Sequence, residues 1–212
     1  MSESRRIRTL WLQLVSGDED RNALDTQMNT GQGRPGDEKT ITNPDEKGMA
    51  HGRMGWLAES PGQFYSYAAD GNKTMITNFM KERLGSLSEG TVLEVGSGSG
   101  QHVVEMATAL PALTFQPTEY PGHPNPRADP QDIDRILGSI RASVAAASLA
   151  NVKDAAFLDA SALASAATDA VAPPGSLAAI GCFNVVHISP IEVLNGLLAG
   201  ASAKLRPGYA CV

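Results

Sequence analysis

The sequence predicts an α/β domain in which helices flank a parallel sheet. Short β-branched stretches such as "TVLEV", residues 91–95, alternate along the chain with longer stretches of helical periodicity. The chain has 212 residues, 42% of them hydrophobic, which is enough for one domain with a core and an additional tail. Strands that alternate with helices pair in parallel through right-handed crossovers.

The N-terminal part lacks the apolar periodicity of a folded domain. Residues 16–60 are rich in Gly, Asp, Glu, Asn and Arg, and such a segment cannot bury enough apolar area to offset its ordering entropy. We therefore expect residues 1–60 to form a disordered tail and residues 61–212 to form the domain.

The first helix of the domain is expected from about Asp70 to Leu84. It ends at Gly85, a residue that commonly caps helix C-termini. The spacing of its apolar residues predicts one buried face, made of Met75, Ile76, Phe79, Met80 and Leu84.

The next elements follow in βαβ order. A strand over 91–95 leads to a helix over 101–110 that stops before Pro111, and "LTFQPTEY" forms the second strand. Further on we expect a helix over 132–149, a strand over 154–160, helix-forming composition in the alanine-rich stretch to 172, a strand over 176–186 and a helix over 190–205.

The last residues, "RPGYACV", have the character of the start of a fifth strand. We expect the sheet to be truncated there, so that the domain is partial and one sheet edge is exposed.

The loop "EVGSGSGQH" indicates close approach of a ligand to the backbone. Gly96, Gly98 and Gly100 are set two residues apart. A nucleoside triphosphate loop would need Lys and Ser or Thr after its last glycine, whereas Gln101 and His102 stand there. A dinucleotide fingerprint would need a third glycine at Gln101, which weakens the NAD hypothesis but leaves it open.

S-adenosylmethionine suits the neighbouring carboxylates better. Glu94 precedes the loop and can attract the ammonium or sulfonium charge of this cofactor, while it would repel a pyrophosphate. Glu119 ends the second strand, where it can accept hydrogen bonds from ribose hydroxyls, and Asp159 can accept one from the adenine amine. The helix that begins at Gln101 offers its first N–H groups to the methionine carboxylate.

Residues for the methyl acceptor are expected after the fourth strand, in "FNVVHISP". Asn184 and His187 project there over the cleft, and His187 can act as a base. An alternative stays open in which His187 only hydrogen-bonds backbone. Ser189 is expected to cap the next helix. His102 is expected to be a locally bonded residue of the helix start.

Several segments together resemble the methyltransferase-like protein 26 family of class I S-adenosylmethionine-dependent methyltransferases. They are "AADGNKTMITNFMKERL", "VLEVGSGSGQHVVEMATALPALTFQPTE", "NVKDAAFLDAS", "FNVVHISP" and "GLLAGASAKLRPG". The resemblance covers about residues 65–207 and implies a Rossmann-like class I methyltransferase fold. It implies that the cofactor is held by Glu94, Gly96, Ser97, Gly98, Gly100, Gln101, Glu119, Asp159 and, at the methionine end, Asn72.

Two departures from that family stand out besides the chain's end. Thr118-Glu119 replaces the family's usual Ser-Asp, and a longer carboxylate still suits a ribose. The proline-rich stretch between Tyr120 and Gln131 looks like an insert beside the adenosine site, and we expect it to loop into solvent.

The composition of the chain limits the kinds of partner that it can be expected to bind. A net charge of −6 gives no basic surface for nucleic acid or an anionic membrane, and no apolar run is long enough for a membrane span. Cys182 and Cys211 lack metal-ligand spacing and are expected to be reduced thiols of a cytoplasmic protein, with an organelle address in the basic N-terminus as the alternative. The expected acceptor is a small molecule or a protein, and no metal is expected. A non-catalytic alternative is an inactive cofactor-binding or interaction module.

Overall fold

A computed structural model describes residues 56–60, 62–122 and 131–211 of the chain. All described elements belong to one compact unit, Gly52–Val212. The expected tail up to residue 55 and residues 123–130 of the proline-rich stretch lie outside the described residues.

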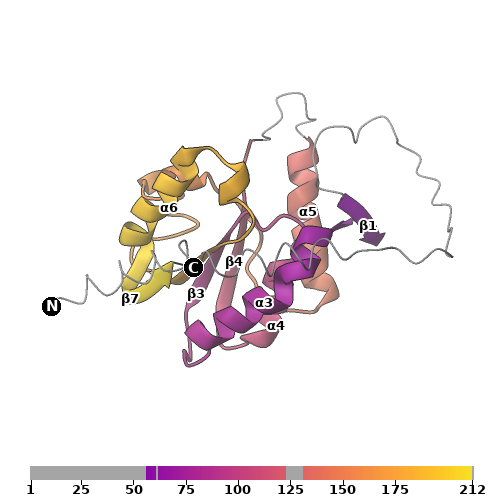
Figure 1. Cartoon of the computed structure of the whole chain (residues 1–212), viewed down its shortest axis with the longest axis horizontal. Helices are drawn as coiled ribbons and strands as arrows, with labels where there is room; N and C mark the ends of the chain where they lie inside the picture. Colours follow the sequence, from indigo (N-terminus) through magenta and orange to yellow (C-terminus); the bar gives the residue numbers. More distant parts are fainter. Residues whose placement is uncertain (1–55, 61, 123–130, 212) are drawn as a thin grey trace, which may run out of the picture. The chain divides into compact units, whose positions relative to one another are not determined.

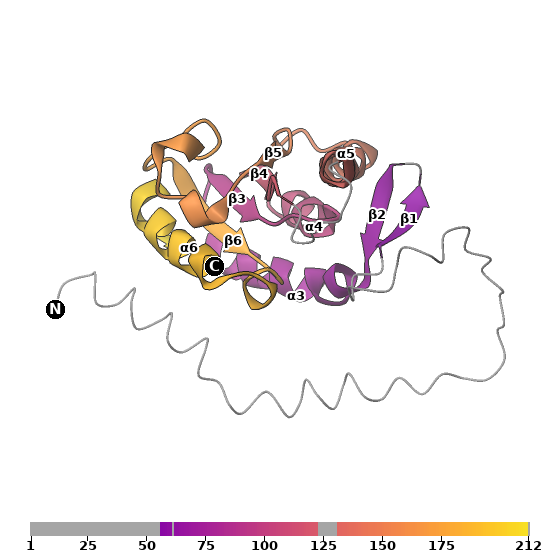
Figure 2. The same cartoon turned by 90° about the horizontal axis from the view of Figure 1, so that it is seen from above.

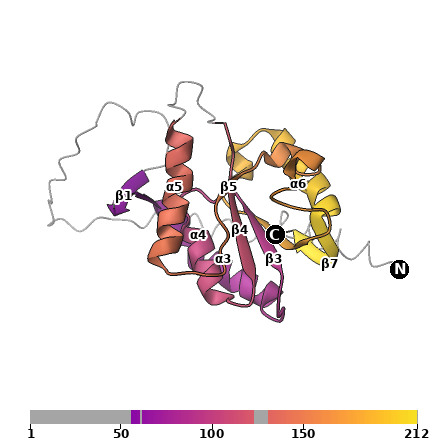
Figure 3. The same ribbon diagram turned by 180° about the vertical axis from the view of Figure 1, so that it is seen from behind.

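A five-stranded parallel sheet forms the centre of the unit, which confirms the predicted α/β, Rossmann-like fold class. The strand order across the sheet is β5-β4-β3-β6-β7, and Figure 3 shows several of these strands side by side. The strands are β3 (Thr91–Val95), β4 (Thr114–Glu119), β5 (Ala156–Phe157), β6 (Leu177–Cys182) and β7 (Leu205–Cys211).

Helices cover both faces of this sheet (Figures 1 and 2). One face packs against α3 (Tyr67–Leu84), α4 (Gln101–Ala109) and α5 (Gln131–Ala146). The other face packs against α6 (Ile191–Lys204), with the 3-10 turns η1 (Ala160–Ala162) and η2 (Ala166–Thr168) beside it.

The alternation of side chains along β3 divides the core between these faces. Val92 packs with α3, α4 and α5, whereas Leu93 and Val95 pack with α6. Glu94 shares the face of Val92, and it therefore lies on the side of α3 and α4 although it sits in the middle of an apolar strand.

A β-hairpin precedes α3. Its strands, β1 (Trp56–Ser60) and β2 (Gln63–Ser66), pair antiparallel, and β1 lies before the expected start of the domain at residue 61. The hairpin is held on α5 because Gln63 Nε2 donates to the carbonyl of Ala142 at 3.2 Å and the amide of Phe64 donates to Ser139 Oγ at 2.8 Å.

Three local predictions were wrong. Met75 is 66% exposed, because α3 buries a narrower stripe that contains Thr77, Met80 and Leu84. Ser189 does not cap α6: its hydroxyl donates to the carbonyl of Val185 at 2.8 Å, and Pro190 takes the cap position.

The alanine-rich stretch after α5 also differs from the expected helix. It folds into η1 and η2 rather than an α-helix. Polar side chains bond the backbone locally: Thr168 Oγ1 donates to the carbonyls of Leu163 and Ser165, both at 2.9 Å. Such bonds compete with the regular helical pattern and override the helix propensity of alanine.

The C-terminal end of α6 carries a buried cation. Lys204 is 1% exposed, forms an ion pair with Asp169 and donates to the carbonyl of Ser165 at 3.3 Å. Because a buried charge without a partner is costly, this pair ties α6 to η2.

Among the described helices, none combines the length and apolarity that crossing a bilayer requires.

Candidate functional site

The candidate site lies at the reversal of strand order between β3 and β6. From β3 the chain moves to β4 and β5 on one side, and it then returns to β6 on the other. At such a switch point the loops after the two central strands diverge, and open α/β sheets bind ligands in the crevice between them. Here these loops are the glycine loop after β3 and the segment around Asn184 after β6.

The glycines of the first loop have backbone conformations that favour glycine, and one of them also has no room for a side chain. Their φ angles are +71° at Gly96, +53° at Gly98 and +85° at Gly100, in the left-handed region. A Cβ on Gly96 would lie 2.4 Å from Cγ2 of Val185, so the two loops touch at this point. The glycines therefore shape the loop as the sequence predicts.

Glu94 lies behind this loop with one oxygen satisfied and one unsatisfied. It is 1% exposed, and its Oε2 accepts a hydrogen bond of 2.7 Å from Ser97 Oγ. Its Oε1 is buried and has no hydrogen-bond partner within the described part of the chain. Burial and, to a smaller extent, the nearby charge of Glu119 together raise the pKa of Glu94 from 4.5 to about 7, against the lowering effect of the hydrogen bond from Ser97.

Ser97 and Thr118 join the glycine loop to β4. The amide of Ser97 donates to the carbonyl of Thr118 at 2.9 Å, and the amide of Thr118 donates back to Ser97 Oγ at 3.2 Å. Thr118 Oγ1 donates to the carbonyl of Glu94 at 2.7 Å. These bonds fix the loop before any ligand arrives.

Glu119 comes together with the loop as its sequence position suggests. Its Oε2 accepts a hydrogen bond of 3.0 Å from the amide of Gly98, and its Oε1 accepts one of 3.0 Å from the amide of Tyr120. Burial raises the pKa of Glu119, while these two hydrogen bonds lower it. Two acidic side chains thus stand on either side of the loop.

A chain of side chains runs from Glu94 to the loop after β6. His102 Nδ1 lies 3.9 Å from Glu94 Oε1, and its Nε2 lies 2.8 Å from Asn72 Oδ1. Asn72 Nδ2 donates in turn to Asn184 Oδ1 at 3.2 Å. The structure therefore brings together Asn72 of α3 and Asn184 of the loop after β6, where the sequence predicts contacts with the methyl acceptor.

Gln101 is the second buried group with an unsatisfied atom. Its Oε1 accepts from the amide of Ser66 at 2.6 Å and from Ser99 Oγ at 2.7 Å. Its Nε2 is buried without a hydrogen-bond partner among the described residues. An unpaired donor at the first residue of α4 thus accompanies the unpaired acceptor of Glu94.

Two predicted site residues lie in more open positions. Asp159 caps η1, where its Oδ1 accepts from the amide of Ser161 at 2.9 Å and from its hydroxyl at 2.6 Å. His187 lies in the turn η3 (Val186–Ile188) and is exposed. Their contacts with adenine and with the acceptor stay predictions.

Sequence reasoning missed the position of His102. The structure places it between Glu94 and Asn72, 5% exposed and with its ring edge-to-face on Phe183. The available signal was its place in the first turn of α4 directly after the loop, but the partner in α3 is thirty positions away. The hydroxyl of Thr118 and the amide of Ser66 were missed for the same reason.

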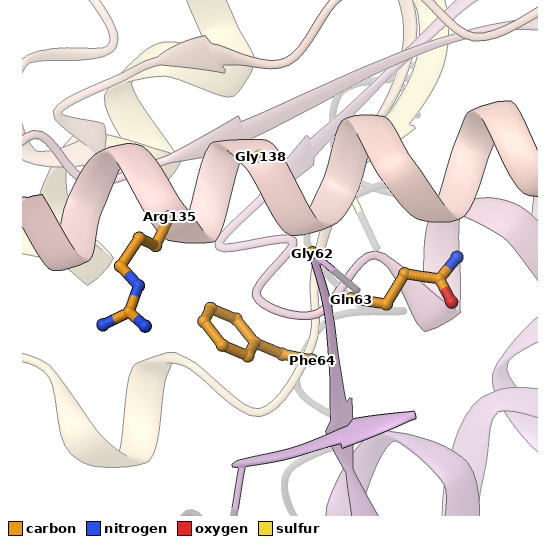
Figure 4. A pocket seen from close by; sticks show the side chains of 5 residues that line it. All are labelled: Gly62, Gln63, Phe64, Arg135 and Gly138. Atoms are coloured by element: carbon orange, nitrogen blue, oxygen red, sulfur yellow. The ribbon is translucent and has the colours of Figure 1, made fainter. Parts of the chain in front are cut away.

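A pocket elsewhere on the molecule does not belong to this site. It has a volume of about 280 Å³ and is lined by Gly62, Gln63, Phe64, Arg135 and Gly138. Figure 4 shows Phe64 of β2 pointing toward Arg135 of α5. None of the residues expected at the site lines it, and the described residues contain no group of three or more His, Cys, Asp or Glu that could hold a metal.

The family model described as "Protein of unknown function (DUF938)" matches residues 63–212. Solved structures of similar shape include the S-adenosylmethionine-dependent methyltransferase SibL in its apo form and the mitomycin 7-O-methyltransferase MmcR. SibL has 19% identity and a TM-score of 0.49 over 68% of this chain and 35% of its own. MmcR has 12% identity and a TM-score of 0.49 over 69% of this chain and 35% of its own.

A third solved structure is the O-methyltransferase TomG from Streptomyces achromogenes in complex with SAM. It has 17% identity and a TM-score of 0.44, over 66% of this chain and 53% of its own. The chain therefore spans about a third of the length of SibL and MmcR. Similarities of this size do not identify an activity, which has to come from the chemistry of the site.

Proposed function

The chain belongs to the DUF938 family, and we propose that it binds S-adenosylmethionine at the glycine loop and transfers its methyl group to an acceptor. One observation carries this proposal above the others. Glu94 places a buried carboxylate oxygen, which has no hydrogen-bond partner among the described residues, behind a loop of left-handed glycines. A buried acceptor of this kind is costly unless a ligand supplies the missing donor.

The unpaired atoms suit the amino-acid end of this cofactor. Its ammonium group can donate to Glu94 Oε1, and its carboxylate can accept from Gln101 Nε2 and from the N–H groups that open α4. An acceptor and a donor that are both buried and both unpaired complement a zwitterion.

The remaining parts of the cofactor are assigned by position. In this proposal Glu119 accepts hydrogen bonds from the ribose hydroxyls in exchange for one of its present backbone bonds, and Asp159 accepts one from the adenine amine. A dinucleotide is less suited, because an anionic pyrophosphate supplies no donor for Glu94 Oε1 and is opposed by the charge of Glu119.

S-adenosylmethionine would supply a methyl group on a positively charged sulfur. The protein's own task is to align the acceptor, exclude water and remove a proton where the acceptor carries one. Asn184, held by Asn72, is the candidate for alignment, and the exposed His187 is the candidate base. The resemblance of the sequence to the methyltransferase-like protein 26 family supports this proposal. The methyl acceptor that we propose is a small molecule or a protein.

Isothermal titration of the whole chain with S-adenosylhomocysteine tests the binding step, with NAD as the matched control. We expect a dissociation constant on the order of micromolar for the first and no heat of binding for the second. Binding of NAD alone would replace the proposal by an oxidoreductase. Binding of neither to a chain with native circular dichroism would contradict the proposal.

A further inference from the structure

Glu94 is a buried acid that no cation neutralises in the described part of the chain. The titratable groups near Glu94 come from the neighbouring elements α3, α4, β4 and β6. His102 of α4 lies 3.9 Å from its Oε1, and Glu119 of β4 acts on it as a like charge. Cys182 of β6 is in register with Val95 and packs on the opposite face of the sheet.

The positive side chain of α3 that acts on His102 is engaged in an ion pair of its own. Lys73 of α3 forms an ion pair of 2.7 Å with Asp70, and its charge acts on His102 rather than on Glu94. Burial lowers the pKa of His102, against a hydrogen bond to the backbone of Ala69, so this imidazole is neutral at pH 7. The ionised form of Glu94 would therefore stand buried beside a neutral ring and another acid.

The geometry also shows where a cation would change this balance. Oε2 accepts a hydrogen bond from the hydroxyl of Ser97, whereas Oε1 has no hydrogen-bond partner in residues 56–60, 62–122 and 131–211 and stands behind the glycine loop. A ligand cation at Oε1 supplies both the missing donor and the missing opposite charge. It stabilises the carboxylate and disfavours the carboxylic acid.

We propose that Glu94 exchanges a proton for the ligand's positive charge. In the free protein Glu94 holds the proton on its carboxyl group. When the ammonium group of the cofactor binds, the O–H bond of Glu94 breaks, the electron pair stays on the carboxylate and the proton passes to the buffer. This inference rests on the proposed function, and it makes cofactor affinity dependent on pH near neutrality.

Two ligands that differ only at the amino-acid end isolate the effect. S-adenosylhomocysteine carries the ammonium group and the carboxylate, whereas 5′-methylthioadenosine carries the same adenosine and sulfur without them. A proton released by Glu119 on ribose binding would appear with both ligands. A proton released by Glu94 appears only with S-adenosylhomocysteine.

The experiment is calorimetric titration of the whole chain in two buffers of different ionisation enthalpy, at pH 6.5 and pH 8.0. With the pKa of free Glu94 at about 7, we expect roughly three-quarters of a proton released per S-adenosylhomocysteine at pH 6.5 and about a tenth at pH 8.0. The affinity then rises roughly fourfold between these pH values. 5′-Methylthioadenosine releases none.

Two variants assign the proton to one side chain. Glu94→Gln retains the shape of the side chain and has no proton to release, so we expect weaker binding of S-adenosylhomocysteine, no proton release and unchanged binding of 5′-methylthioadenosine. His102→Gln removes the imidazole and retains a donor for Asn72, and we expect its proton release to equal that of the wild type. Unchanged 5′-methylthioadenosine binding shows that each variant is folded.

The outcomes separate this inference from the proposed function. Binding of S-adenosylhomocysteine with no proton release at pH 6.5, or with release that survives in Glu94→Gln, overturns the inference and leaves the cofactor proposal standing. Release that is lost in His102→Gln but kept in Glu94→Gln assigns the proton to His102 and also overturns it. Failure of both ligands to bind removes the proposed function and this inference together.

Discussion

At the scale of single residues, Glu94 is the position where function and stability conflict. An apolar side chain in the middle of β3 would complete the packing between Val92 and α4. The chain instead places a carboxylate there, and one of its oxygens has no hydrogen-bond partner in the part of the chain that the structure describes. Burying such a group without a full set of partners costs stability. The observation is explained if the group is retained for a ligand.

The cost of Glu94 has a defined dependence on pH. Because its pKa rises from 4.5 to about 7 on folding, the folded protein holds this proton more tightly than the unfolded chain. Its contribution to the free energy of unfolding is full below pH 4.5 and is lost as the pH rises through 7. Relative to Glu94→Gln, the wild type should lose on the order of 3 kcal/mol between pH 4 and pH 8.

Urea unfolding of both proteins across this range measures the difference. Comparison with the variant cancels the contributions of the titrating groups that do not interact with Glu94. Curves of stability against pH that run parallel for the two proteins would show that folding leaves the pKa of Glu94 unchanged.

The role of the Glu119 side chain is tested by ligand affinity rather than by stability. We expect Glu119→Ala to weaken binding of S-adenosylhomocysteine by about 1–3 kcal/mol, because charge-assisted hydrogen bonds to the ribose are lost. The control is Asp154→Ala, which removes a surface carboxylate paired with Arg141. Equal affinities of Glu119→Ala and the control would exclude Glu119 from the site.

At the scale of elements, the glycine loop is a junction between β3, α4 and the segment after β6. Gly96 allows it to touch Val185, and the bond from the amide of Gly98 to Glu119 ties it to β4. A loop built in this way holds its shape without a ligand, which reduces the entropy cost of binding.

One glycine substitution tests the loop, and a second one outside the loop is its matched control. Gly96→Ala requires a left-handed φ of +71° and places a Cβ 2.4 Å from Val185. We expect it to destabilise the fold by about 1–3 kcal/mol and to reduce S-adenosylhomocysteine binding. Gly138→Ala adds the same atom in α5 with nothing within 4 Å, and should stabilise the helix by up to about 1 kcal/mol.

Thermal unfolding and calorimetric titration of the two variants provide the comparison. A Gly96→Ala protein as stable as Gly138→Ala and with wild-type affinity would mean that the contact between the loops is not required.

The elements themselves were largely predictable, because each depends on a local pattern. The β-branched run of β3, the cap at Gly85 and the stop before Pro111 all act within a few residues. The prediction failed where contacts with distant residues, or local contacts that compete with helix formation, determine the structure. Thr168 bonded the backbone of an alanine-rich stretch, and the packing of α3 left Met75 in solvent.

At the scale of the whole molecule, strand order determines what the site contains. Sequence reasoning placed Glu94, Glu119 and Asn184 at strand ends, but only the order β5-β4-β3-β6-β7 brings the loops after β3 and β6 together. The chain from Glu94 through His102 and Asn72 to Asn184 joins three separate parts of the sequence. No local pattern contains that information.

The central claim is that the ligand occupies the glycine loop, and hydrogen exchange of the whole chain with and without S-adenosylhomocysteine tests it most directly. We expect slower exchange in peptides that cover residues 94–104 and 117–122, because the ligand covers the loop and the end of β4, and unchanged exchange in α6 over 191–204. Protection confined to α6 or to the pocket between β2 and α5, with none at the loop under saturating ligand, would contradict the account.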